Sequence, residues 1–293
     1  MTANMSVSDE KEKSIFRYLS EYDRRIIYFL LFIVVVGPLI SPIAMPISVS
    51  PDSKQYYDVL RTLGSNDIVL TVLDTEFSGY MELQSGVIAS TRMIIEKESK
   101  MAVAISHPEA TIIPDILFGA LKDLMDAHHY TYGDSYLVLG YIYQNEASVA
   151  SSAEDFQGFV RQDWQGRPIK GTFLEQVRSW KDISLIVSHT TGILSGSVMN
   201  HFALRGTRMI VNCIGGMIPG QKTYLNTGIL KAVLPAMRGG AELESLIGIR
   251  GLGTKAMDAF TLGHYMLIAF IIIGNIGYFG YARPRAQKAR TGG

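Results

Sequence analysis

The fold is decided by one short stretch, Ile68–Glu76, which reads IVLTVLDTE. Its first six residues are almost continuously apolar and rich in β-branched side chains. A strand with one face in water alternates apolar and polar residues, whereas a strand covered on both faces is apolar throughout. The stretch therefore predicts a buried strand, Ile68–Leu73, that ends at three polar residues.

Working outward, four more stretches share this composition: Met101–Ile105, Tyr136–Ile142, Ile183–Val187 and Met209–Val211. Between the strands, apolar residues recur three and four positions apart, as in helices: Tyr80–Ser99, Ile112–His128, Ala147–Val160, Ser195–Leu204 and Leu225–Leu246. This alternation predicts an α/β fold with a doubly wound, mostly parallel sheet of about five strands, similar to Rossmann folds. The turn-rich segment Gln162–Trp180 does not fit the alternation and is interpreted as a surface excursion.

Two long apolar segments flank the predicted domain, at 26–45 and 261–282. A helix needs about 20 residues to cross the hydrocarbon core of a bilayer, because it rises about 1.5 Å per residue. Both segments are predicted to be transmembrane helices around a domain at 46–260. For the first segment a cleaved signal peptide is the alternative, although no clear cleavage site follows Pro38.

The orientation follows from the cations outside the two segments. Arg24 and Arg25 directly precede the first segment, and four cations follow the second: Arg283, Arg285, Lys288 and Arg290. Lysine and arginine favour the cytoplasmic side of a membrane. We therefore expect cytoplasmic tails at 1–25 and 283–293, an extracytoplasmic domain, and location in the cytoplasmic membrane.

Composition excludes several classes of function. The chain has equal numbers of cationic and acidic residues and no basic face is evident, so a nucleic-acid partner is not expected. The single cysteine, Cys213, excludes an intramolecular disulfide. The six histidines show no pairing at metal-ligand spacing, so no metal site is predicted. No cofactor motif is present; Gly248–Lys255 superficially resembles a phosphate loop but follows a helix, and is interpreted as a flexible link.

Polar residues follow the predicted strands at the points where ligands bind in doubly wound folds. The candidates for ligand binding are Asp74 and Glu76 after the first strand, His107 after the second and His189 after the fourth. The alternative is that strands simply end where polar loops begin.

A histidine and a cysteine after consecutive strands also match the layout of caspase-like cysteine hydrolases. In such a site His189 would accept the thiol proton and Cys213 would attack a carbonyl carbon as the thiolate. A lone cysteine at a strand end is more often a packing residue. The sequence therefore favours a non-enzymatic protein and leaves enzyme activity undecided.

The second apolar segment contains Gly274, Asn275, Gly277 and Gly280. Glycines allow helices to approach closely, and an amide in hydrocarbon favours a hydrogen bond to another helix. These four residues are predicted to mediate helix packing, either with the first segment or with another subunit.

Three blocks carry a resemblance to a known family: Tyr132–Tyr141, Tyr224–Leu230 together with Arg238–Glu242, and Gly253–Ala259 leading into Gly274–Tyr278. From about Ile43 onward the chain resembles a family of prokaryotic membrane proteins with two transmembrane helices around a central α/β domain. The resemblance implies that topology and brings no activity with it.

Three functional hypotheses follow. The first is a non-enzymatic structural or assembly subunit of an oligomeric membrane complex, whose partners are the lipid bilayer and copies of itself or other membrane subunits. The second is a membrane-tethered module that binds a ligand with its strand-end loops. The third is the cysteine hydrolase.

Overall fold

The structure is a computed structural model that describes residues 23–192 and 194–282. The predicted tail 283–293 and most of the predicted tail 1–25 lie outside these residues. The chain divides into two compact units, one of Pro46–Thr254 and one that combines the segments up to Met45 and from Lys255.

The unit Pro46–Thr254 is built on a six-stranded sheet in which every neighbouring pair is parallel. The strands are β1 (Ile68–Asp74), β2 (Lys100–Ile105), β3 (Tyr136–Tyr141), β4 (Leu185–Thr190), β5 (Arg208–Cys213) and β6 (Ala232–Pro235). Their order is β3-β2-β1-β4-β5-β6, the order of the doubly wound fold. The predicted α/β fold is confirmed.

The sixth strand was not predicted, because its residues lie within the predicted helix Leu225–Leu246. That region forms α10 (Ile218–Asn226), β6 and α11 (Ala236–Leu246). The strand has four residues, too few to show a strand pattern inside a longer apolar run. Ala236, with φ +49°, turns the chain directly from β6 into α11.

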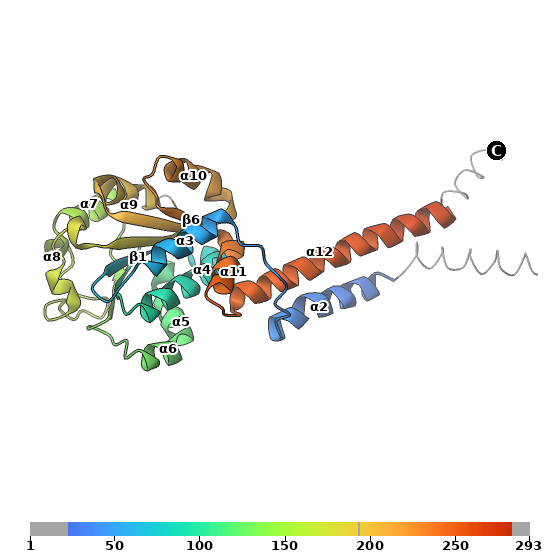
Figure 1. The fold of residues 1–293 in the computed structure, drawn as a ribbon, viewed down its shortest axis with the longest axis horizontal. Coiled ribbons are helices and arrows are strands. Elements are labelled where there is room, and N and C mark those ends of the chain that lie inside the picture. The colour runs from blue at the N-terminus through green and yellow to red at the C-terminus, as the bar shows by residue number, and fades with distance from the viewer. Residues whose placement is uncertain (1–22, 193, 283–293) are drawn as a thin grey trace, which may run out of the picture. The chain divides into compact units, whose positions relative to one another are not determined.

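Helices cover both faces of the sheet (Figure 1). One apolar core includes residues of α3 (Pro51–Arg61), α4 (Phe77–Glu96), α5 (Ile113–Ala120), α6 (Lys122–Ala127) and α11. The other includes residues of α7 (Glu146–Glu154), α8 (Phe156–Phe159), α9 (Leu194–His201) and α10. Residues alternate between these cores along each strand, which fixes the face on which each strand-end side chain lies.

The predicted flexible link before the last helix is instead held by a buried carboxylate. Glu244, 2% exposed, accepts hydrogen bonds from the amides of Gly251 (3.1 Å), Gly253 (2.9 Å) and Thr254 (2.7 Å). These amides lie at the start of α12 (Leu252–Gly277), where a helix leaves its first N–H groups without partners. Glu244 therefore caps α12.

A second buried carboxylate anchors the N-cap residue of the first helix of the domain. Ser50 is the N-cap of α3, and its amide (3.0 Å) and hydroxyl (2.5 Å) both donate to the buried carboxylate of Glu242. The contact joins the first residues of this unit to α11.

Among the described residues, one helix is long and apolar enough to cross a membrane: Leu252–Gly280, 29 residues. It starts earlier than the predicted segment 261–282 and ends in a π-helical turn, Tyr278–Ala282. The helix at the other end, α2 (Arg24–Ile40), has 17 residues and is about 26 Å long. The predicted helix 26–45 is thus wrong at its end, because Ser41 has extended backbone. A second transmembrane span stays a prediction.

Within the unit that holds α2 and most of α12, the segment after α2 is tied to α12. Asp258, 1% exposed, accepts hydrogen bonds from the amides of Ala44 (2.7 Å) and Met45 (2.9 Å). Ala44 has φ +57°, a left-handed conformation that non-glycine residues rarely adopt. The carboxylate stabilises this turn where the chain leaves the unit.

Candidate functional site

The candidate site lies where the strand order reverses. β1 pairs with both β2 and β4, and in the second pairing Asp74 lies opposite Thr190. After β1 the chain continues into α4 on one face of the sheet, and after β4 it continues into α9 on the other face. The loops after β1 and β4 therefore separate and leave room for ligands at the carboxyl ends of the strands. The residues that follow β1, β2 and β4 meet here.

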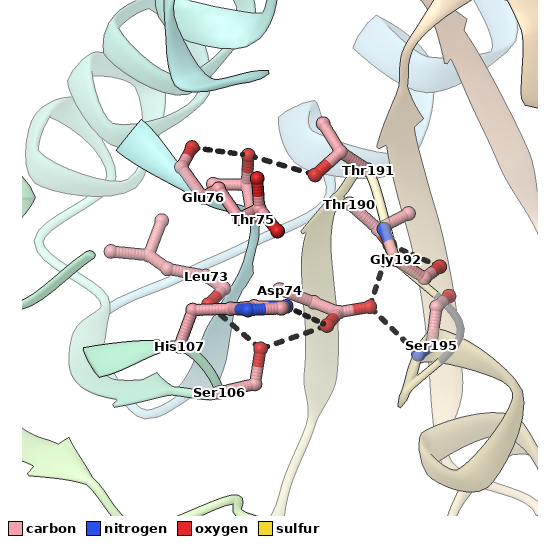
Figure 2. A network of polar contacts seen from close by, with 10 residues as sticks. All are labelled: Leu73, Asp74, Thr75, Glu76, Ser106, His107, Thr190, Thr191, Gly192 and Ser195. Carbon is pink, nitrogen blue, oxygen red and sulfur yellow. Dashed lines mark hydrogen bonds and ion pairs between the residues drawn. The ribbon is translucent and has the colours of Figure 1, made fainter. Parts of the chain in front are cut away.

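Asp74 is the centre of a polar network (Figure 2). One carboxylate oxygen accepts a hydrogen bond from the hydroxyl of Ser106 (2.8 Å). The other accepts from the hydroxyl of Thr190 (2.6 Å) and from the amide of Ser195 at the start of α9 (3.0 Å). The side chain is buried. Because three donors from three elements converge on it, Asp74 fixes the relative positions of the loops.

His107 completes this network on its partly exposed side. Its Nε2 lies 3.5 Å from the Asp74 carboxylate, and a third of its side chain is exposed. Figure 2 shows the imidazole beside Ser106, directed at Asp74. The carboxylate faces Nε2, which orients the ring and favours a proton on that nitrogen.

A second set of contacts closes the crevice on the side of α4. The hydroxyls of Thr75 and Thr191 are 3.1 Å apart, and the amide of Thr191 donates to the carbonyl of Asp74. A Cβ at Gly79 would lie 2.5 Å from the methyl carbon of Thr191, so a larger residue at this turn of α4 would require the Thr191 side chain to move. Dinucleotide folds place a pyrophosphate at this helix N-terminus, but here the side chain of Thr191 lies against it.

The open space lies beside Asp74, on the face covered by α7 and α9. A pocket of about 550 Å³ is lined there by Asp74, His107, Gln144, Glu146, Gly192 and Ser197, together with Ser106, Tyr143 and Asn145. The volume is within the range of small-molecule sites. The described lining contains two carboxylates and no lysine or arginine.

Glu76 and His189 do not line this pocket. Glu76 is exposed at the N-cap position of α4, where its side chain makes no capping bond. His189 is buried and lies one position before Thr190, so it points to the opposite face of the sheet from Asp74. Of the four predicted ligand-binding residues, the structure brings together Asp74 and His107.

His189 sits under α4 and pairs with Asn212. The amide nitrogen of Asn212 lies 3.2 Å from the carbonyl of Leu83 and 3.1 Å from Nδ1 of His189. Because this nitrogen can only donate, Nδ1 accepts and the ring proton is on Nε2. Burial lowers the pKa of His189 from 6.5 to about 3, so the ring is neutral.

Cys213 does not form a dyad with His189. Cys213 lies beside Thr190 in the ladder, and its side chain belongs to the core under α7 to α10, whereas His189 faces α4. The thiol is buried, and burial raises its pKa to about 12. The predicted hydrolase arrangement is therefore wrong, because a shift of one residue along a strand reverses the face.

The other predicted features lie apart from the pocket. Within the described residues, no group of three histidine, cysteine, aspartate or glutamate side chains is arranged to hold a metal ion. In α12 the side-chain amide of Asn275 donates to the carbonyl of Ile271 in the same helix (2.8 Å), and Gly277 is buried. One donor of the Asn275 amide is thus bonded within its own helix.

Sequence reasoning missed the residues that build the pocket around His107. Gln144 and Glu146 follow β3, and Ser197 lies on α9. The signal was present, since Gln144 and Glu146 come after a predicted strand. The contribution of Ser197 depends on the packing of α9 against the sheet, which no short sequence pattern specifies.

In comparisons with known proteins, no family model, curated protein or solved structure matches the chain.

Proposed function

We propose that the protein is a membrane-tethered module that binds a small polar ligand in the pocket beside Asp74. The observation that carries the proposal is the geometry of His107, which a buried carboxylate holds at the rim of a 550 Å³ pocket at the switch point. A polar side chain held this way is pre-organised for a ligand, because little freedom is lost on binding. Asp74 acts as the positioning residue, and His107, Gln144 and Ser197 supply ligand contacts.

The charge of the lining restricts the ligand. Asp74 and Glu146 are carboxylates, and the described lining contains no lysine or arginine. Charge complementarity favours a cationic or neutral ligand over an anion. We infer a small molecule with amine or hydroxyl donors, for which the Glu146 carboxylate, 3.3 Å from Nε2 of His201 through one of its oxygens, is the acceptor.

The test is a thermal-unfolding screen of the full-length protein in detergent. The probes are putrescine, lysine and choline as cations, myo-inositol as a neutral polyol, and inorganic phosphate and AMP as anions. A ligand that binds only the folded state raises its stability by about 2.7 kcal/mol at a hundred times its Kd. We expect stabilisation by at least one cationic or neutral probe and none by the anions.

Two variants locate the binding. His107→Ala and Gln144→Ala should weaken the response to the active probe by about tenfold in Kd, which corresponds to 1.4 kcal/mol. His128→Ala, at the end of α6, is the matched control and should leave it unchanged. Stabilisation by no probe, or by anions alone, contradicts the proposal, and so does an unchanged response in both pocket variants.

The tether is the second part of the proposal. One described helix, Leu252–Gly280, is long and apolar enough to span a bilayer. We propose that α12 crosses the cytoplasmic membrane and that α2, with the arginines at its start, is a second, shorter span. Cysteine-accessibility labelling of Trp164→Cys, an exposed position of the domain, and of Ser14→Cys in the predicted cytoplasmic tail tests the orientation in intact cells. If the cysteine at position 164 reacts only with a reagent on the cytoplasmic side, the proposed orientation is contradicted.

Assembly through the membrane helices is a second candidate function, supported by Gly277, which is the one buried residue within 260–280 of this apolar helix. A homo-oligomer or a complex with other membrane subunits would use this glycine for close helix approach. Gly277→Leu should then shift the detergent-solubilised protein to a smaller species in analytical ultracentrifugation. Gly263→Leu is the control, because a Cβ there meets no atom within 4 Å. If the wild-type protein sediments as a monomer, the proposal of a homo-oligomer is contradicted.

A further inference from the structure

A second, separate pocket lies at the outer edge of the sheet. It has a volume of about 640 Å³ and an apolar lining formed by the ends of β2 and β3, by Phe159 at the end of α8 and by Val160. Its other lining residues include Trp164, Tyr141, Arg161 and Gln162. Trp164 is 46% exposed, so a large apolar surface of this residue is open to solvent.

Trp164 stands on a rigid loop. The neighbouring carboxylate, Asp163, is 4% exposed and accepts hydrogen bonds from the amides of Gln165 (2.9 Å) and Arg167 (2.8 Å). It also accepts from the Tyr132 hydroxyl (2.8 Å) and from Nε of Arg167 (2.8 Å). The indole is therefore presented by a pre-formed turn.

The turn that carries Trp164 packs closely against the edge strand β3. Gly140 has φ +78°, and a Cβ there would lie 3.0 Å from the Cβ of Trp164. The β2–β3 register shifts at the same place, between Val103 and Ala104. This bulge lets the chain around Trp164 approach β3 closely.

An extended peptide does not fit as the occupant. A peptide that added to the edge of β3 would need its free main-chain carbonyls. The carbonyls of Tyr136, Val138 and Gly140 already accept hydrogen bonds from the chain itself, from the amides of Gly133, Trp164 and Ile142. The pocket is open, but this edge of the sheet is closed to strand addition.

We propose that this pocket binds a saccharide ring, with the ring stacked on Trp164. A sugar ring has an apolar face of C–H groups and hydroxyls that point outward in several directions. The indole and the apolar lining match the face, while Arg161, Gln162 and Tyr141, which also line the pocket, carry polar groups that can bond to the hydroxyls. A planar aromatic ligand has polar atoms only in its own plane and would leave most of these groups unused.

The test uses Trp164 as its own reporter in the full-length protein in detergent. The chain has two tryptophans, so Trp180→Phe leaves Trp164 as the single tryptophan. Chitotriose, maltotriose and a uronic-acid trisaccharide are the saccharide probes, and adenosine is the planar aromatic probe. A saturable change in Trp164 emission with at least one trisaccharide, and none with adenosine, is the expected result.

A direct binding measurement completes the test. In isothermal titration calorimetry, Trp164→Ala should weaken binding of the active trisaccharide at least about tenfold, whereas Trp180→Phe should not change it. If Trp164→Ala unfolds the chain, Gln162→Ala on the exposed rim should still reduce affinity several-fold. No response to any trisaccharide at millimolar concentration, a response to adenosine alone, or unchanged binding in Trp164→Ala and Gln162→Ala overturns the proposal.

Discussion

At the scale of single residues, one position along a strand decides which side of the sheet a functional group serves. Thr190 joins the network around Asp74, and the preceding His189 is sealed under α4. The sequence placed both at a strand end and could not say which one faces the pocket. The face to which each side chain of a strand points depends on the register of that strand with its neighbours, and long-range packing determines the register.

The neutral state of His189 predicts a pH dependence of stability. Its pKa is about 3 in the folded protein and near 6.5 when exposed, so between these values the unfolded chain binds more protons. The free energy of unfolding should therefore fall as the pH drops below 6.5, by up to about 1.4 kcal/mol per pH unit from this group. Urea unfolding between pH 4.5 and 7.5 measures it.

The comparison variant for this prediction is His189→Gln, which cannot gain the proton. Its stability should be less sensitive to pH in the same range, even if it is lower throughout. His128→Ala, at a helix end, removes a partly exposed histidine and should leave the slope close to that of the wild type. Equal slopes for His189→Gln and the wild type would show that His189 titrates normally.

At the scale of elements, the helix starts depend on acidic residues that lie far away in the sequence or in another helix. Glu244 on α11 caps α12, and Glu242 on the same helix anchors Ser50, the N-cap residue of α3. No local pattern such as Ser-x-x-Glu announces these caps. This is why Gly248–Lys255 was predicted as a flexible link although its amides are held in a fixed arrangement.

Replacement of Glu244 by glutamine should destabilise the protein. The amide keeps the shape of the side chain but turns one of its two acceptors into a donor that faces amides of the first turn of α12. Leaving a buried donor unpaired costs about 1–3 kcal/mol. We expect a loss of about 2 kcal/mol in denaturant unfolding of the full-length protein.

The exposed Glu109→Gln substitution is the control for this effect. It should change the stability by less than about 0.5 kcal/mol, as is usual for surface substitutions. If Glu244→Gln costs no more than Glu109→Gln, the carboxylate contributes nothing as a cap.

At the scale of the whole molecule, the layered α/β architecture followed from apolar runs and helical periodicity, because these patterns repeat over many residues. The sixth strand, a four-residue edge, carried too little signal. The candidate site was predicted in part: Asp74 and His107 come together, while Glu76 and His189 lie elsewhere. The rest of the site depends on which loops the strand order brings into contact.

The segment between α2 and the domain should depend on Asp258. Removal of its carboxylate in Asp258→Ala leaves the amides of Ala44 and Met45 without their acceptor. We expect faster proteolytic cleavage within 41–49 in the detergent-solubilised protein, read by mass spectrometry of the fragments. Asp123→Ala, an exposed change on α6, is the control. Cleavage at the same rate in both variants would show that Asp258 does not restrain this segment.

The bond between Ser50 and Glu242 also sets an order in time. The two residues are 192 positions apart, so the carboxylate that anchors the N-cap residue of α3 is absent until most of the chain has left the ribosome. Closing so long a loop is an intrinsically slow step in folding. During synthesis α3 therefore has only its local cap, the Ser50 hydroxyl that accepts from the amide of Ser53, and the domain becomes complete only shortly before α12 itself emerges.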